Sequence, residues 1–196
     1  MVYTTNMLLE KYINYTNPYD KIRRECLEGH LIKLKRGLYD DDKTIPPYMR
    51  SGYIYGPSYI SFEFALSFFE LIPEYVPNVT CASFRKNKTK RYDTDSCSYI
   101  YRDVPAKVFP LSVIPHIEKG YSYLMATPEK ALCDELYTVK QVHSFDDFTA
   151  LLLEDLRVDM GALREVNWDS VKDLAPLYER SNTDYLLTYW EKEIKK

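Results

Sequence analysis

The sequence predicts an α+β protein in two parts. Residues 1–45 form a small helix-and-hairpin module, and residues 46–196 form a mixed α/β domain with a helical C-terminal part. The acidic run Asp40–Lys43, followed by Pro46-Pro47, has the composition of a linker between them. Strand-like runs gather in the middle of the chain, and helical spacing of apolar residues dominates after Thr127.

The first part predicts two helices and a hairpin. The first helix ends at Asn17-Pro18, a pair that breaks helices. The second begins near Tyr19 and ends at Gly29, because glycine readily terminates a helix. The turn-like Lys35-Arg36-Gly37 then separates two apolar runs and predicts a hairpin. The apolar stripes of the two helices are formed by Leu8, Leu9, Tyr12 and Ile13, and by Ile22, Cys26 and Leu27.

The middle of the chain predicts one buried helix and three strands. Ser61 precedes a run of apolar residues at helical spacing, so we expect it to cap a helix that Pro73 ends. The short runs that follow favour an antiparallel meander. These runs are Asn78–Phe84, Thr89–Tyr92 and Cys97–Arg102.

The remainder predicts helices with recognisable starts. Thr127-Pro128-Glu129 places proline at the first helical position and an acid in the first turn. We expect later helices to begin at Ser144, at Asn167, and at Asn182 or Thr183.

The charge also changes along the chain. The net charge is −3, but residues 1–107 hold 16 Lys+Arg against 13 Asp+Glu, whereas residues 144–196 hold 7 against 12. A mildly basic front and an acidic rear indicate two surfaces with different partners.

Motifs of common enzyme classes do not occur in the sequence. It has no glycine-rich phosphate loop, no GxSxG turn and no HExxH. The four cysteines form no CxxC pair and the three histidines are scattered, which argues against zinc. We therefore expect no catalytic residue, no metal and no cofactor. The sequence shows neither a signal peptide nor an apolar run of membrane length, so we expect a cytoplasmic protein with free thiols and no membrane partner.

Two acidic pairs are the only candidates for a metal-dependent nuclease. Asp93 with Asp95, and Asp146-Asp147, have the carboxylates that such a site needs. A turn and a helix N-terminus explain them more simply, so we disfavour this function.

Six cations in the first part are candidates for binding duplex DNA. In a winged helix, one helix enters the major groove while a basic hairpin places cations against phosphate. The equally weighted alternative is a helical hairpin with solvated lysines. The helix cations are Lys21, Arg23 and Arg24, and the wing cations are Lys33, Lys35 and Arg36.

A second basic run lies at an expected turn between strands. It could bind phosphate, but a charged edge strand that stays soluble is the slightly favoured explanation. Its cations include Arg85, Lys86, Lys88 and Lys90.

Six segments in order resemble the AbiEi antitoxin family of abortive-infection, type IV toxin–antitoxin systems. They extend over roughly residues 31–137, and the clearest match is Ala126-Thr127-Pro128-Glu129-Lys130-Ala131-Leu132-Cys133-Asp134. The segments are Arg36–Tyr39, Gly56–Leu66, Leu71–Glu74, Val79-Thr80 with the basic turn after it, Ser98–Arg102 and Ala126–Asp134.

The resemblance implies an N-terminal winged helix joined to an α/β antitoxin domain. Such proteins bind their own promoter as duplex DNA and counteract a nucleotidyltransferase toxin, generally without stable direct contact. This sequence departs from the family at its front, where the interval from Leu8 to Asp20 is too short for a further helix. We therefore expect a reduced winged helix. The alternative function is a protein-interaction module without specific DNA binding, in which the acidic helical tail holds a partner.

Overall fold

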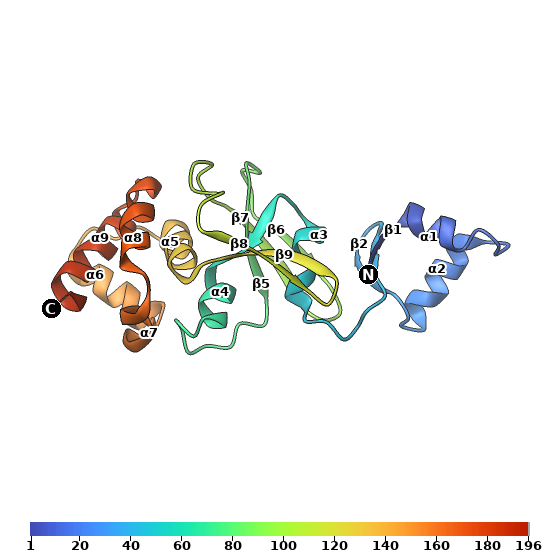
Figure 1. The fold of residues 1–196 in the computed structure, drawn as a ribbon, viewed down its shortest axis with the longest axis horizontal. Coiled ribbons are helices and arrows are strands. Elements are labelled where there is room, and N and C mark those ends of the chain that lie inside the picture. Colours follow the sequence, from blue (N-terminus) through green and yellow to red (C-terminus); the bar gives the residue numbers. More distant parts are fainter. Residues whose placement is uncertain (196) are drawn as a thin grey trace.

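The computed structural model describes residues 1–195 and is an α+β protein. Its parts follow one another along the long axis of the molecule (Figure 1). The N-terminal elements lie at one end, a twisted sheet lies in the middle, and the C-terminal helices lie at the other end.

The N-terminal part is a three-stranded sheet with two helices. Thr4 and Asn17 cap the helices, since their side chains accept hydrogen bonds from the backbone N–H groups of Met7 and Asp20. The outer strand β1, which sequence patterns did not reveal, pairs with β3. The elements are β1 (Val2–Thr4), α1 (Thr5–Lys11), α2 (Pro18–Leu27), β2 (Ile32–Lys35) and β3 (Leu38–Asp40).

The two predicted helices and the hairpin are present, but the first helix ends at Lys11, well before Asn17-Pro18, and two residues of the expected inner faces are exposed. Leu8, Tyr12, Ile22 and Leu31 form a small core. By contrast, Ile13 and Leu27 were expected to face inward but are 72% and 76% exposed. Ile13 lies beyond the end of α1, and Leu27 is the last residue of α2.

The middle of the molecule is a six-stranded mixed sheet with strand order β6-β7-β5-β4-β9-β8. The expected antiparallel meander is wrong, because β5 runs parallel to β7. Every residue of β5 is buried, which suits an inner strand, whereas the charged β6 forms the edge. The hairpin of β8 and β9 was not predicted. The strands are β4 (Ser58–Ile60), β5 (Val79–Ser83), β6 (Lys90–Asp93), β7 (Ser98–Asp103), β8 (Val113–Glu118) and β9 (Tyr121–Ala126).

Helices cover both faces of this sheet. A short 3-10 turn η1 (Pro47–Arg50) and α3 (Ser51–Ile54) pack on one face, where Tyr99 and Tyr101 donate hydrogen bonds to the carbonyls of Pro47 and Ser51. On the other face lie α4 (Phe62–Phe68) and α5 (Pro128–Thr138). Ser61 precedes α4 as expected but makes no cap, because its hydroxyl donates to a carboxylate of α5.

The C-terminal helices begin close to where the sequence placed them. Thr127, Ser144 and Asn167 each accept a backbone hydrogen bond as N-caps. The last helix starts at Ser181, one residue early, and Asn182 is buried inside it. The elements are α6 (Phe145–Ala150), η2 (Leu151–Asp155), α7 (Met160–Glu165), α8 (Trp168–Leu174), η3 (Ala175–Tyr178), α9 (Ser181–Tyr189) and η4 (Trp190–Ile194).

The segment expected to be a linker carries buried contacts. Asp40 is fully buried and accepts hydrogen bonds of 2.6 Å from Arg50 Nε and from the Tyr121 hydroxyl. Burial opposes ionisation of Asp40, but these hydrogen bonds outweigh it and lower the pKa of the carboxyl. Leu34 and Ile45 also belong to the main core. The segment is therefore tied to the main core despite its linker-like composition, and a domain boundary there stays a prediction.

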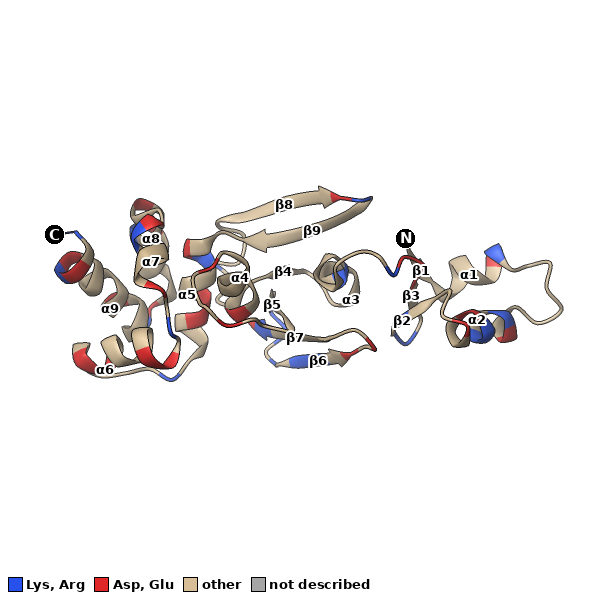
Figure 2. Cartoon of the chain, turned by 90° about the horizontal axis from the view of Figure 1, so that it is seen from below, with Lys and Arg blue, Asp and Glu red and all other residues tan. Residues whose placement is uncertain are grey.

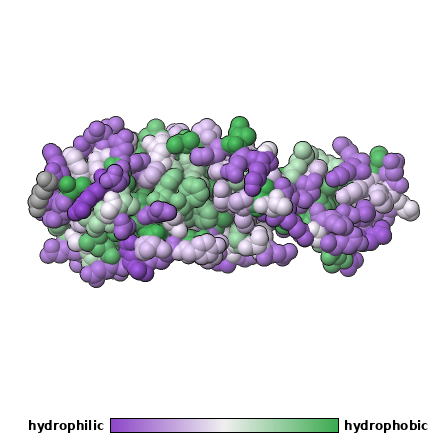
Figure 3. Space-filling model, turned by 60° about the horizontal axis from the view of Figure 1, so that its bottom comes forward, coloured by the Kyte–Doolittle hydropathy of each residue, from purple (hydrophilic) through white to green (hydrophobic). Residues whose placement is uncertain are grey.

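Surface character changes along the molecule. In the view of Figure 3, the N-terminal end is largely hydrophilic, and hydrophobic colour gathers over the middle. Among residues 1–195, no helix has the length and apolar character needed to cross a membrane.

Candidate nucleic-acid interface

The outer face of α2 presents two arginines between exposed apolar side chains. Arg23 and Arg24 are both exposed, and Tyr19 and Leu27 beside them are 64% and 76% exposed. Because residues three and four apart share one side of a helix, these side chains form one continuous face. Two of the predicted helix cations therefore point to solvent.

A cavity of about 470 Å³ brings one of these arginines together with the wing. Arg23 from α2, Lys33 from β2 and Arg36 from the β2–β3 turn all line it. Gly37 makes the tight turn possible, since its φ of +81° is a conformation that glycine adopts without strain. Three exposed cations from separate elements thus surround one concave surface, an arrangement that attracts the negative charge of a nucleic acid.

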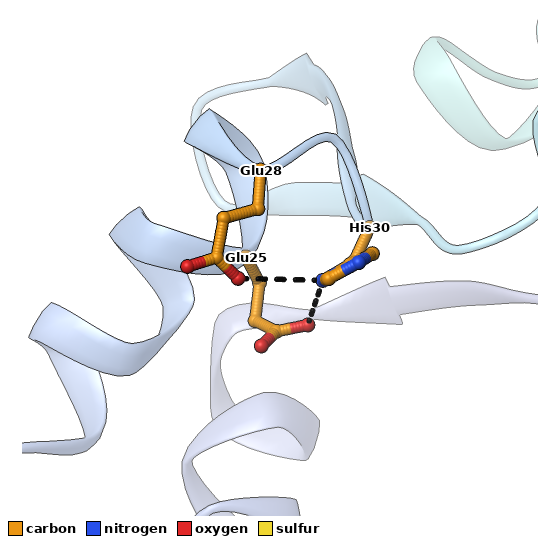
Figure 4. Close-up of side chains that lie close together, drawn as sticks. All are labelled: Glu25, Glu28 and His30. Carbon is orange, nitrogen blue, oxygen red and sulfur yellow. Dashed lines mark ion pairs between the residues drawn. The ribbon is translucent and has the colours of Figure 1, made fainter.

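Lys21 does not join this cavity. Its ammonium forms an ion pair with Glu25 one turn along α2, and this hydrogen bond raises the pKa of Lys21 and lowers that of Glu25. Figure 4 shows Glu25 beside Glu28 and His30, whose Nδ1 lies 3.3 Å and 3.5 Å from the two carboxylates. Ion pairs within this group explain its arrangement. Its carboxylates would repel phosphate at the C-terminal end of α2.

Lys35 lies at the junction between the N-terminal part and the large sheet. Its ammonium donates a hydrogen bond to the carbonyl of Ile54 and lies 5.9 Å from the centre of the Tyr92 ring. Tyr92 belongs to the edge strand β6, and Lys90 lies 5.6 Å from the same ring. The fold therefore places the wing beside the second basic run, although more than 50 residues separate Lys35 from Lys90.

The second basic run combines cations with aromatic rings. Lys86 lies 5.2 Å from the centre of the Tyr55 ring, and Arg85 lies 5.1 Å from that of Phe84. Arg85, Lys88 and Lys90 are exposed. In Figure 2 the blue residues of α2, the wing and β6 lie along the same side of the molecule. We call the cations Arg23, Arg24, Lys33, Arg36, Lys86, Lys88 and Lys90 together the basic side.

The acidic pairs considered for a nuclease lie far apart in the sequence, at β6 and at the start of α6. Asp93 accepts hydrogen bonds from Ser98 and Arg91, which lower the pKa of its carboxyl. Asp146 and Asp147 occupy the first turn of α6. Among residues 1–195, the only group of three side chains close enough to share a metal ion is Glu25, Glu28 and His30.

The four cysteines are all free. Burial raises the pKa of each thiol, which disfavours the reactive thiolate.

A buried ionic cluster lies within the segment that carries the clearest family resemblance. Lys130 and Asp134 are both fully buried on α5, and their charged atoms are 2.8 Å apart. Asp134 also accepts hydrogen bonds of 2.5, 2.7 and 2.9 Å from Tyr178, Ser61 and Tyr59. A carboxylate has about four acceptor positions, so this one is fully partnered. We interpret the cluster as a clamp that joins β4, α5 and η3. Its i,i+4 spacing is visible in the sequence, but its partners are not.

Comparison of the sequence with protein-family models gives no match, and neither does comparison with curated proteins. The resemblance described above therefore depends on the quoted segments themselves.

Proposed function

We propose that this protein binds duplex DNA and represses its own promoter as part of a toxin–antitoxin operon. The observation that carries the proposal is the cavity lined by Arg23, Lys33 and Arg36 next to the exposed face of α2. Exposed cations that converge from several elements are the usual means of attracting a duplex and fixing the protein's register on it.

The order of the N-terminal elements supports a reduced winged helix. Two helices joined by the short segment between Lys11 and Pro18 precede a two-stranded hairpin. In our proposal α2 enters the major groove with Arg23 and Arg24, and the hairpin places Lys33 and Arg36 against the backbone. The second basic run continues the contact to neighbouring phosphates.

The antitoxin role rests on the sequence resemblance. The acid-rich C-terminal half repels nucleic acid, so a second partner would use that half (Figure 2).

The test of the antitoxin role is co-expression of the full-length chain with a nucleotidyltransferase encoded next to it. Restored growth supports the role. Growth arrest despite normal levels of folded protein argues against it and favours a DNA-binding protein without antitoxin activity.

The experiment for DNA binding compares two labelled duplexes by fluorescence anisotropy. One carries the promoter of the protein's own operon, and the other has the same bases in scrambled order. We expect tighter binding to the promoter. Equal affinity for both duplexes would contradict repression of the protein's own promoter. Binding to neither duplex would contradict the whole proposal.

Substitutions on the hairpin and on α2 should affect DNA binding in different ways. Lys33→Gln with Arg36→Gln should weaken binding to both duplexes by a similar factor, because phosphate contacts carry no sequence information. Arg23→Gln with Arg24→Gln should lower the preference for the promoter, by about 1–3 kcal/mol for each base that an arginine no longer recognises. The two dissociation constants of each variant check this. An equal change of preference in both variants would contradict the assignment.

A further inference from the structure

A second cavity lies on the opposite face of the large sheet from Tyr99 and Tyr101. It encloses about 380 Å³ between α4, the loop before β5, β7 and α5. A volume of this size suits a small ligand. Its walls include the apolar side chains of Leu66, Ile72, Val76 and Leu156.

A buried carboxyl without a full set of partners lines this cavity. Glu135 is only 3% exposed, and across residues 1–195 no group donates a hydrogen bond to its Oε2 atom. The nearest cation is Arg102, whose Nη1 lies 3.9 Å from Oε2. Arg102 is shared between several groups, since its Nη2 pairs with Glu63 and its guanidinium lies 4.3 Å from the centre of the Phe62 ring, while its buried Nε has no hydrogen-bond partner among residues 1–195. An acceptor atom is thus left unsatisfied, at a cost in stability that a ligand would relieve.

The surroundings of Glu135 disfavour its ionised form. Burial, Glu63 on α4 and Asp134 on α5 raise the pKa of Glu135, while Arg102 on β7 opposes them. The net effect holds the pKa well above its usual range. A bound cation would favour the ionised carboxylate.

Acids outnumber cations in the lining of the cavity. Glu63, Glu74, Glu135 and Asp155 line it, against one Arg102. Glu74 pairs at 2.5 Å with Arg157 outside the lining, and the single Arg102 faces both Glu63 and Glu135, so the lining keeps an excess of negative charge. At the rim, the 86% exposed Tyr75 presents a ring that can contact a cation.

We propose that this cavity binds a primary ammonium group on a short apolar chain, with the Glu135 carboxylate as its counter-ion. The ammonium donates to Oε2, and the chain packs between Leu66, Ile72, Val76 and Leu156. The site lies apart from the basic side and does not depend on DNA binding. The same chemistry is found in free alkylamines and in the lysine side chain.

The test titrates the full-length protein with n-butylamine at pH 8 and follows amide shifts by NMR. Butan-1-ol is the uncharged probe of equal length. We expect butylamine to bind at least tenfold more tightly than butanol and to shift amides of α4, α5 and β7. Glu135→Gln should abolish that preference, whereas the exposed Glu118→Gln should keep it. Equal binding of amine and alcohol, or an unchanged preference in Glu135→Gln, would overturn the proposal.

The pH dependence provides a readout that a purely structural role would not change. Below the pKa of Glu135, binding must ionise the carboxyl, so affinity for butylamine should rise about tenfold per pH unit until that pKa is passed. Glu135→Gln should show no such rise while its melting curve remains cooperative. Blocked lysine, acetylated at its α-amine and amidated at its carboxyl, distinguishes a lysine side chain from a free alkylamine as the natural ligand. If blocked lysine binds as tightly as butylamine or more tightly, the ligand is a protein side chain. If it binds more weakly than butylamine, the ligand is a free amine. If neither butylamine nor blocked lysine bound at pH 8, the proposal would be overturned.

Discussion

Replacing Asp134 with alanine is expected to destabilise the protein by about 3–5 kcal/mol, because a buried cation is then left without its counter-ion. As a hydrogen-bond partner Lys130 would keep the Tyr178 hydroxyl, which accepts its hydrogen bond at 2.5 Å. The hydroxyls of Tyr59 and Ser61 would lose their acceptor as well. Since a domain is stable by only about 5–15 kcal/mol, this single change removes a large fraction of the total.

The converse substitution should cost less. In Lys130→Met, Asp134 still accepts from three hydroxyls, so its buried charge remains partly stabilised. Urea unfolding followed by circular dichroism gives both free energies of unfolding. The exposed Asp95→Ala is the matched control and should stay within about 0.5 kcal/mol of the parent. If Asp134→Ala unfolded at the same urea concentration as the control, the cluster would not hold these elements together.

Reversing the three charges around the N-terminal cavity is expected to reduce DNA affinity by more than about 100-fold, since hydrogen bonds to charged groups contribute about 1.5–3 kcal/mol each. The variant carries Arg23→Glu, Lys33→Glu and Arg36→Glu. All three side chains are exposed, so the fold should be retained. Fluorescence anisotropy with the promoter duplex measures the loss.

A charge-matched variant separates a local contact from an effect of net charge. It carries Lys140→Glu, Arg164→Glu and Lys192→Glu, three exposed positions in the C-terminal half. We expect it to bind DNA within a few-fold of the parent. If both triple variants lost affinity equally, long-range repulsion would explain the result, and the cavity would have no special role.

Local features were accessible from the sequence. Thr127-Pro128 and Ser144 mark helix starts through hydrogen bonds within one turn, so neighbouring residues suffice to predict them. The hairpin around Gly37 is equally local. For the interface, sequence patterns identified the cations but not which of them are free, because the ion pair of Lys21 and the hydrogen bond from Lys35 depend on the positions of other side chains and elements.

Features that depend on distant residues were not predicted. The parallel pairing of β5 with β7 follows from which strands become buried in the sheet, and periodicity alone does not determine this. The contacts of Asp40 with Arg50 and Tyr121 join an apparently polar linker to the core. Likewise, the cavity at Glu135 combines residues of α4, β5, β7, α5, η2 and the loop before β5, and their proximity is not visible in the sequence.

The salt dependence of promoter binding tests the proposed DNA contact most directly. For the parent protein, the logarithm of the association constant should fall linearly with the logarithm of salt concentration, with a slope of about −0.9 for each phosphate contact. Lys33→Gln with Arg36→Gln should make that slope shallower by about 1.8, which corresponds to two fewer phosphate contacts. Absence of binding at low salt, or an identical slope for parent and variant, would contradict the assignment of the wing to the DNA backbone.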